Sequence, residues 1–191
     1  TNINSGESLR LLLRPLQRLN QRLTHMIAVA NVLKGTAFGT CLIGATVTGD
    51  EPLIAQTSTA SRLSKLKAAF ELSDFDVEVL LLVIAPEIDR RYERLYAQLQ
   101  QHAFGQEYRK PTIALSLNVL CPDSTRKENA CHRFSPDAPL IQFGLIRVGE
   151  SAIESERTLT LDPIISRYLR GLSVQPQRLP YAEMSWPDKI A

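Results

Sequence analysis

Apolar residues recur over the first part of the chain with the spacing of an amphipathic helix. Between residues 5 and 33 they are separated by three or four positions in turn, which is the period of a heptad seam. The pattern predicts one long helix over residues 5–33. Pro15 falls inside it; because proline has no amide proton and its ring clashes with the preceding turn, we expect a kink or a break near residue 14.

The apolar stripe of this helix is a candidate interaction seam. Because each fully buried leucine contributes about 1.5–3 kcal/mol, such a seam could hold a partner helix or a second copy of the chain. The alternative is that it packs within its own domain, on the apolar helix expected at 77–84. Four arginines at four-residue spacing lie on another face, and we interpret them as solvated. The seam consists of Leu9, Leu12, Leu16, Leu19, Leu23 and Met26.

A glycine-rich connector follows the first helix. Residues 35–59 contain four glycines and no lysine or arginine, so we assign residues 1–59 to the helix and its connector. Gly44 and Gly49 have the spacing of a P-loop, but such a loop needs a lysine where this chain has Asp50. A carboxylate there would repel a nucleotide, so we expect only a glycine-rich turn.

From residue 60 onward the chain reads as a series of short, well-delimited elements. Ser73 and Thr112 are candidate N-caps, because their hydroxyls can accept from the free amides of a first helical turn. Pro86 suits the first turn of a further helix. Short alternating stretches at 145–148 and 157–161 predict two strands joined by a turn.

Helices followed by a two-stranded hairpin are the arrangement of a winged helix. We therefore expect an α+β, mostly helical fold: a winged-helix-like domain with a two-stranded wing over residues 60–171, preceded by a long N-terminal helix. Residues 172–191 contain three prolines, two of them within the extended stretch 174–180, and are interpreted as a linker.

Composition limits the chemistry that the chain can carry. The formal net charge is only +2, which implies no obligate polyanionic partner. The three cysteines (Cys41, Cys121 and Cys131) are an odd number, which favours reduced thiols and a cytoplasmic location. Their spacing to His132 fits no common zinc site, and no apolar run approaches the length of a membrane span. We expect no enzymatic activity, no metal and no cofactor in this chain.

DNA binding is the alternative function, because winged helices often read the major groove. In that case the reading helix would be the one that precedes the strands, at 136–143. It offers only Gln142 for base edges and carries Asp137, whose charge repels phosphate. The wing region adds Glu150, Glu154 and Glu156, so this pattern argues against nucleic acid.

Several blocks of the chain, in this order, carry a resemblance to a known family. They begin with Phe-Glu-Leu-Ser-Asp-Phe at residue 70, Ala-Pro-Glu-Ile-Asp-Arg-Arg-Tyr at 85, Pro-Thr at 111, Arg-Phe-Ser-Pro-Asp-Ala-Pro-Leu at 133 and Gly-Leu at 144. Over residues 60–171 the chain resembles the N-terminal, variant winged-helix region of bacterial AAA+ ATPases. The blocks hold caps, helix starts and core positions, and no catalytic residue.

The resemblance implies a non-catalytic interaction and regulatory domain that recruits substrates or partners and assists assembly. It implies that an ATPase module follows Ala191, and that ATP and Mg²⁺ belong to that module. The expected partners are proteins, including the chain's own AAA+ module, together with self-association through the N-terminal seam. Neither nucleic acid nor membrane is expected as a partner.

Overall fold

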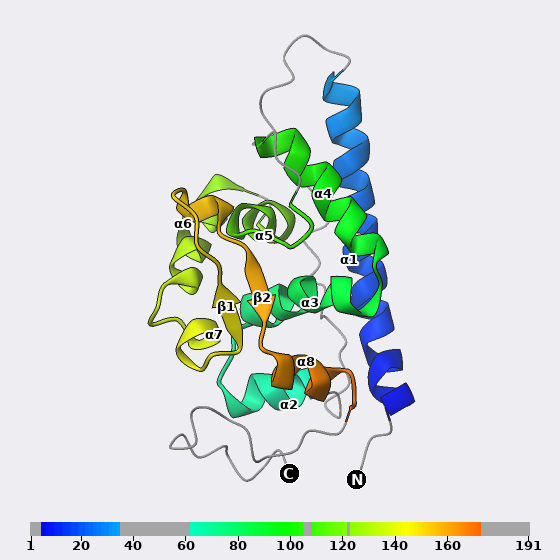
Figure 1. Cartoon of the computed structure of the whole chain (residues 1–191), viewed down its shortest axis with the longest axis vertical. Helices are drawn as coiled ribbons and strands as arrows, with labels where there is room; N and C mark the ends of the chain where they lie inside the picture. The colour runs from blue at the N-terminus through cyan, green and yellow to red at the C-terminus, as the bar shows by residue number, and fades with distance from the viewer. Residues whose placement is uncertain (1–4, 35–61, 105–107, 122, 173–191) are drawn as a thin grey trace.

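The computed structural model describes residues 5–34, 62–104, 108–121 and 123–172 (Figure 1). Side chains at 5–9, 32–34 and 102–104 are outside this description. The connector at 35–59 with its Asp50 turn, and the linker beyond residue 172, also lie outside the described residues. The described part is mostly helical with one two-stranded antiparallel sheet, so the predicted fold class is confirmed.

The first helix, α1, runs without interruption over Ser5–Lys34. Of the kink or break expected near residue 14, the break is therefore wrong, because the helix continues through Pro15. Pro15 is itself buried, and the helix packs against the rest of the domain on both sides of it. The hydroxyl of Tyr92 on α4 (Arg91–Phe104) donates to the carbonyl oxygen of Leu16 at 2.7 Å, which fastens α1 one residue after the proline. Tertiary packing thus outweighs the local cost of proline.

The centre of the domain is α3 (Asp74–Ile88), which is buried at every position from 76 to 85. Its start is the predicted one: the hydroxyl of Ser73 accepts from the amide of Asp76 at 3.2 Å. Pro86, however, lies inside α3 and does not open the next helix. The proline cannot donate to the carbonyl of Leu82 four residues earlier, but the buried hydroxyl of Tyr96 does so at 2.8 Å.

Replacing Tyr96 with phenylalanine is expected to cost about 1–3 kcal/mol, because it leaves the buried carbonyl of Leu82 without a donor. Tyr92→Phe is the matched control. It removes a hydroxyl that also binds a helical carbonyl, but that of Leu16 keeps its own helical amide donor. Urea unfolding of both variants measures the difference; equal losses would contradict the role given to Tyr96.

The wing forms where the sequence predicts it, with shorter strands. β1 (Ile146–Val148) pairs antiparallel with β2 (Leu159–Leu161), with Ile146 opposite Leu161. The other edge of β2 receives Pro111 and Thr112: the amide of Leu159 donates to the Pro111 carbonyl at 2.7 Å. The segment that caps the next helix is thereby tied to the wing.

Five further helices complete the described part, together with two short 3-10 turns. The helices are α2 (Arg62–Ala69), α5 (Ile113–Leu120), α6 (Ser124–Cys131), α7 (Pro139–Gln142) and α8 (Pro163–Leu169). The 3-10 turns are η2 (His132–Phe134) and η3 (Glu154–Glu156). None of the described helices is long and apolar enough to cross a membrane.

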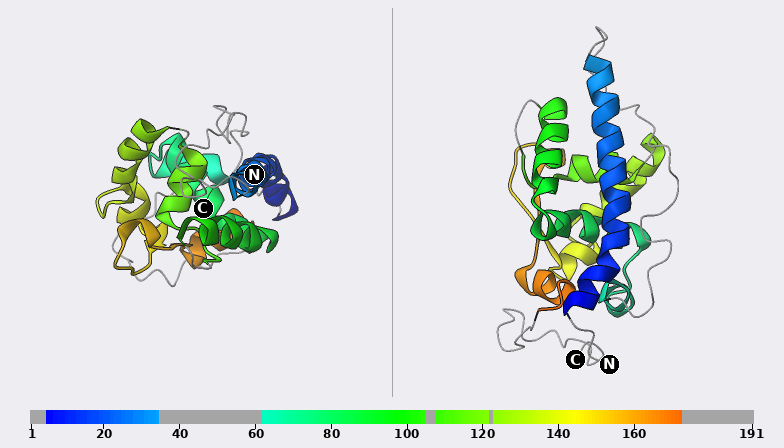
Figure 2. Two further views of the ribbon diagram at one scale, coloured as in Figure 1. Left: turned by 90° about the horizontal axis from the view of Figure 1, so that it is seen from above. Right: turned by 90° about the vertical axis from the view of Figure 1, so that its right-hand side faces the viewer.

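One hydrophobic core joins the N-terminal helix to the wing. Leu19 and Leu23 of α1 are fully buried in the same cluster as Leu80 of α3 and Leu145 beside β1. Figure 2 shows α1 lying along α4 at one side of the molecule, with the wing at a distance from it. The boundary that we placed near residue 59 therefore separates segments of sequence and does not divide the core.

Candidate interaction surfaces

The helix-turn-helix unit of the domain consists of α5 and α6. α5 is mostly buried and is capped by Thr112, whose hydroxyl accepts from the Leu115 amide at 3.2 Å. α6 follows across a short turn and exposes all but Ala130 and the half-buried Lys127. It therefore occupies the second position of a helix-turn-helix, the one that reads DNA in proteins that do so.

The helix predicted at 136–143 to be the reading helix is only one turn long. A turn at 135–138 precedes α7, with the amide of Ala138 donating to the carbonyl of Ser135 at 3.0 Å. Gly144 then ends it in the left-handed conformation, at φ 64°. The short helix closed by Gly144 therefore stands directly before β1 as predicted, and α6 is a second exposed helix that could occupy the reading position.

The cations of the helix-turn-helix unit are engaged within the domain. Arg126 lies 3.4 Å from the carboxylate of Asp123, which also caps α6. Lys127 donates to the side-chain oxygen of Asn118 on α5 at 2.9 Å. The third cation, Arg133, follows α6 and is bound to α3. These contacts leave this surface poorly suited to phosphate, which needs cations that can turn outward.

Arg133 forms the one ion pair of the described residues in which a carboxylate is fully buried. Its guanidinium donates to both oxygens of Asp76, through Nε at 3.0 Å and through a terminal nitrogen, and to the hydroxyl of Ser73 at 3.1 Å. Asp76 has no exposed surface and also accepts from the Ser73 amide at 2.8 Å. The cluster joins the capped start of α3 to η2, beyond the end of α6.

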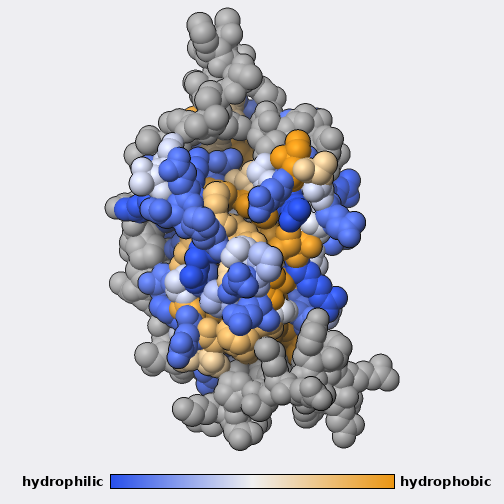
Figure 3. Space-filling view, turned by 90° about the vertical axis from the view of Figure 1, so that its left-hand side faces the viewer, coloured by the Kyte–Doolittle hydropathy of each residue, from blue (hydrophilic) through white to orange (hydrophobic). Residues whose placement is uncertain are grey.

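The loop of the wing is acidic and carries an exposed apolar side chain. Ile153 is 54% exposed, the highest value among the large hydrophobic residues in the described segments. Glu150 and Glu154 flank it, and Glu156 accepts from the hydroxyl of Tyr108 at 3.3 Å. Figure 3 looks at the side that carries α6, α7 and the wing and shows polar groups interspersed with apolar ones.

The predicted N-terminal seam faces the core of its own domain. Leu12, Leu16, Leu19, Leu23 and Met26 are each at most 4% exposed and belong to the single core cluster. The side chain of Leu9 is outside the described residues. The observed arrangement is the intramolecular alternative, with α4 as the principal neighbour and α3 as a second one. In this structure the seam is not a surface that a partner could reach.

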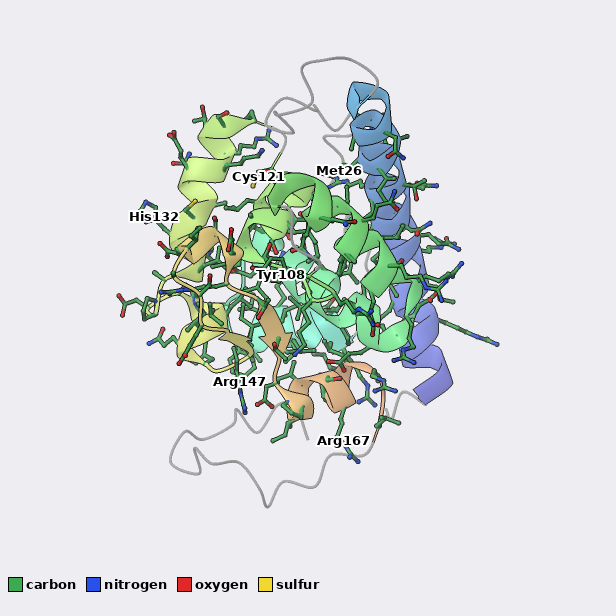
Figure 4. The ribbon with its side chains drawn as sticks, turned by 45° about the horizontal axis from the view of Figure 1, so that its top comes forward. Met26, Tyr108, Cys121, His132, Arg147 and Arg167 are labelled. Atoms are coloured by element: carbon green, nitrogen blue, oxygen red, sulfur yellow. The ribbon has the colours of Figure 1, made fainter. Side chains whose placement is uncertain are left out.

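The thiols and histidines do not assemble into a metal site. Among the described residues there is no group of three or more His, Cys, Asp or Glu that could hold a metal ion. Cys121 is buried at the end of α5, and Cys131 and His132 are exposed; Figure 4 labels Cys121 and His132. Burial raises the pKa of the Cys121 thiol to about 11. Cys41 is outside the described residues.

We expect Cys131 to react with a thiol reagent much faster than Cys121 in the folded protein. The thiolate is the reactive form, and a thiol with a pKa near 11 is almost entirely protonated at neutral pH. The measurement is made with Cys41→Ser as background, so that two thiols are counted. Both should react together after denaturation; equal rates in the native state would contradict the burial of Cys121.

Sequence reasoning missed the Ser73–Asp76–Arg133 cluster. Helix capping accounted for Asp76 by itself, and nothing local indicates a partner that follows 57 residues later. It also missed Ile153, because a single apolar residue in an acidic loop breaks no pattern. The one sequence signal for Arg133 is that it begins a block, Arg-Phe-Ser-Pro-Asp-Ala-Pro-Leu, that carries the family resemblance.

Comparison with known proteins gives one match. Residues 53–180 match a protein family described as "Winged helix domain, variant", which covers about two thirds of the chain. No curated protein and no solved structure matches the chain significantly. The matched span contains α2 to α8 and the wing, and begins after α1.

Proposed function

We propose that this chain, which belongs to the variant winged helix domain family, is a non-catalytic protein-interaction domain that serves an AAA+ ATPase. The observation that carries the proposal is that two of the three cations at the helix-turn-helix, Lys127 and Arg133, are bound by acceptors of the domain itself, so that only Arg126, in a solvent-exposed pair with Asp123, can readily turn outward. A winged helix whose exposed helix has its cations so held is better suited to a protein partner than to a phosphate backbone.

The charge of the wing supports the same preference. Glu150, Glu154 and Glu156 lie in the loop that would approach the DNA backbone beside the reading helix. Carboxylates at that place repel phosphate at distances within the Debye length, about 10 Å at 0.1 M salt. DNA binding remains the competing function, since α6 also exposes Asn129, a side chain that can bind a base edge.

The link with an AAA+ ATPase rests on the resemblance of residues 60–171, which fall within the matched span of 53–180. In this proposal the chain recruits or positions proteins, and nucleotide is bound and hydrolysed by a separate module. The residues of this chain would then contribute no ligand to ATP or Mg²⁺. Its cytoplasmic location is part of the same proposal.

A salt titration of DNA binding tests the function. Fluorescence anisotropy with duplex DNA should show weak association that does not depend on Arg126 or Lys127. A DNA-binding winged helix would instead lose affinity steeply with salt, in proportion to the phosphates it neutralises. Loss of that binding in Arg126→Ala and Lys127→Ala, with the fold intact, would overturn the protein-interaction proposal.

The AAA+ association has a separate test. The reading frame downstream of codon 191 should encode a P-loop, Gly-x-x-x-x-Gly-Lys-Ser/Thr, in a following domain. The chain by itself should show no thermal stabilisation by ATP and Mg²⁺. A frame that ends without such a motif, or nucleotide turnover by the isolated chain, would contradict this part of the proposal.

A further inference from the structure

Four arginines line the outer face of α1, and Glu7 at the start of the helix is its one acidic residue. From residue 8 to residue 49 the sequence contains no aspartate or glutamate. Arg10, Arg14, Arg18 and Arg22 succeed one another at four-residue spacing, so that they form a row along the helix. Arg10 and Arg14 are exposed, whereas Arg18 and Arg22 are half-buried and have contacts within the domain.

The start of α4 brings a second group of cations to the side of the domain that carries α1. The hydrogen bond from Tyr92 to the Leu16 carbonyl, 2.7 Å long, places the first turn of α4 against the middle of α1. The two helices lie side by side in both views of Figure 2. Three further cations follow in this turn, and we name the two groups together the α1–α4 ridge. The ridge consists of Arg10, Arg14, Arg18, Arg22, Arg90, Arg91 and Arg94.

The acids near this turn do not neutralise the ridge. Asp89 binds Arg91 at 2.6 Å, and the pKa of its carboxyl is lowered by that hydrogen bond. Glu93 lies 3.8 Å from Arg90. Arg94 is exposed and forms no ion pair with another described residue. The seven cations of the ridge are therefore accompanied by three acids, Glu7, Asp89 and Glu93.

Like charges four residues apart destabilise a helix, and the one acidic residue of α1 is Glu7, three residues before Arg10 at the start of the row. The helix is held instead by its opposite, buried face. Leu13 lies one turn after Arg10 and is 49% exposed, one of four large hydrophobic side chains of the described residues that face solvent. An exposed apolar side chain next to an arginine is typical of a protein–protein interface.

We propose that the α1–α4 ridge docks an acidic amphipathic helix of a partner protein. Carboxylates four residues apart on that helix would be spaced about 6 Å apart along the helix axis. The arginines of α1 have the same spacing, so the two rows match. An apolar residue between the carboxylates would cover Leu13. This inference rests on the proposed function, because it assigns a binding face and a partner chemistry to an interaction domain.

A protein helix fits the ridge better than nucleic acid or an anionic membrane does. Leu13 offers nothing to a phosphate or a lipid headgroup, and half of the α1 row is already engaged within the domain. A formal net charge of +2 also provides little of the long-range attraction that polyanions require.

The test uses a synthetic helical peptide with glutamate at four-residue spacing and a central leucine, and a second peptide with glutamine in place of glutamate. The variant Arg10→Glu/Arg14→Glu changes the ridge. The matched control, Lys65→Glu/Lys110→Glu, makes the same change of net charge at exposed positions on α2 and before α5. Circular dichroism establishes that each variant is folded.

We expect the glutamate peptide to bind at about 0.1 M salt and to dissociate near 1 M, where the Debye length falls to about 3 Å. The ridge variant should weaken it about tenfold or more, and the control less than about threefold. Leu13→Gln should weaken the binding of the glutamate peptide with its central leucine. The affinity of a third peptide, which keeps the glutamates but has glutamine in place of the central leucine, should not change.

Three results would overturn the inference. Equal losses in the ridge variant and the control would indicate attraction to net charge alone. Binding of the glutamine peptide as tight as that of the glutamate peptide would exclude an acidic partner. The third result is that duplex DNA or anionic vesicles bind more tightly than the peptide and lose this binding in the ridge variant. The ridge would then be a binding site for nucleic acid or membrane. Failure of the proposed function would instead appear as binding of DNA through Arg126 and Lys127.

Discussion

Replacing Leu16 and Leu23 together by aspartate is expected to unfold the whole domain. Leu16 is 4% exposed and Leu23 is not exposed at all, and both lie in the core that α1 shares with α3, α4 and the wing. Each change removes a side chain worth about 1.5–3 kcal/mol of burial and places a carboxylate in an apolar interior at a cost of several kcal/mol. The sum matches or exceeds the 5–15 kcal/mol that stabilises a typical domain.

Leu13→Asp is the matched control for this prediction. It puts the same side chain on the same helix, but Leu13 is 49% exposed, so the change in the free energy of unfolding should stay within about 0.5 kcal/mol. Circular dichroism and urea titration measure both variants. A double variant that remains cooperatively folded, and only loses self-association, would show that the seam faces a second copy of the chain.

The amphipathic period identified the helix and its buried face, but could not identify what covers that face. A heptad-like spacing fixes which residues of α1 lie on one side, because that depends only on the helical repeat. The neighbour is determined by the tertiary fold. The principal one here is α4, and Tyr92 adds a hydrogen bond to the Leu16 carbonyl that no pattern of apolar residues could indicate.

Features encoded within a few residues were predicted well. Ser73 and Thr112 cap the helices as expected, because the cap needs only a side-chain oxygen and the amides of the next turn. The strands of the wing were also found, since alternation is local. The prolines were misread for the opposite reason. Pro15 and Pro86 are tolerated because distant elements pack around them, and Tyr96 supplies the donor that Pro86 lacks.

The sequence indicated the short helix before the wing but gave little sign of α6 as a second exposed helix. The residues at 136–143 contain caps and a helix terminator close together, which leaves room for only one turn. α6 has a weaker apolar pattern, because all but one of its side chains are exposed or half-buried, and such a helix gives little periodic signal. Its position after α5 becomes evident only in the fold.

Replacing Arg133 with methionine is expected to cost about 2–3 kcal/mol of stability. Asp76 would keep its bonds from the amide and hydroxyl of Ser73 but would lose both bonds from the guanidinium. Removing one partner of a fully buried pair costs about 3–5 kcal/mol. We expect a smaller loss than this because the side chain of Arg133 is itself 33% exposed, so that water can partly replace its charge.

Changing Asp76 should cost less stability than changing Arg133, and a double-mutant cycle measures the coupling between the two residues. Asp76→Asn can still accept the capping bonds, and the freed Arg133 can turn to solvent, so this variant should lose only about 1 kcal/mol.

Arg126→Met is the matched control for Arg133→Met. The ion pair of Arg126 with Asp123 is more than half exposed, so the loss of stability in this control should stay below about 0.5 kcal/mol. Urea unfolding of the single variants and of Asp76→Asn/Arg133→Met gives the coupling energy. Additive losses would mean that the buried carboxylate is stabilised by Ser73 and the helix start alone, and that Arg133 does not hold η2 to α3.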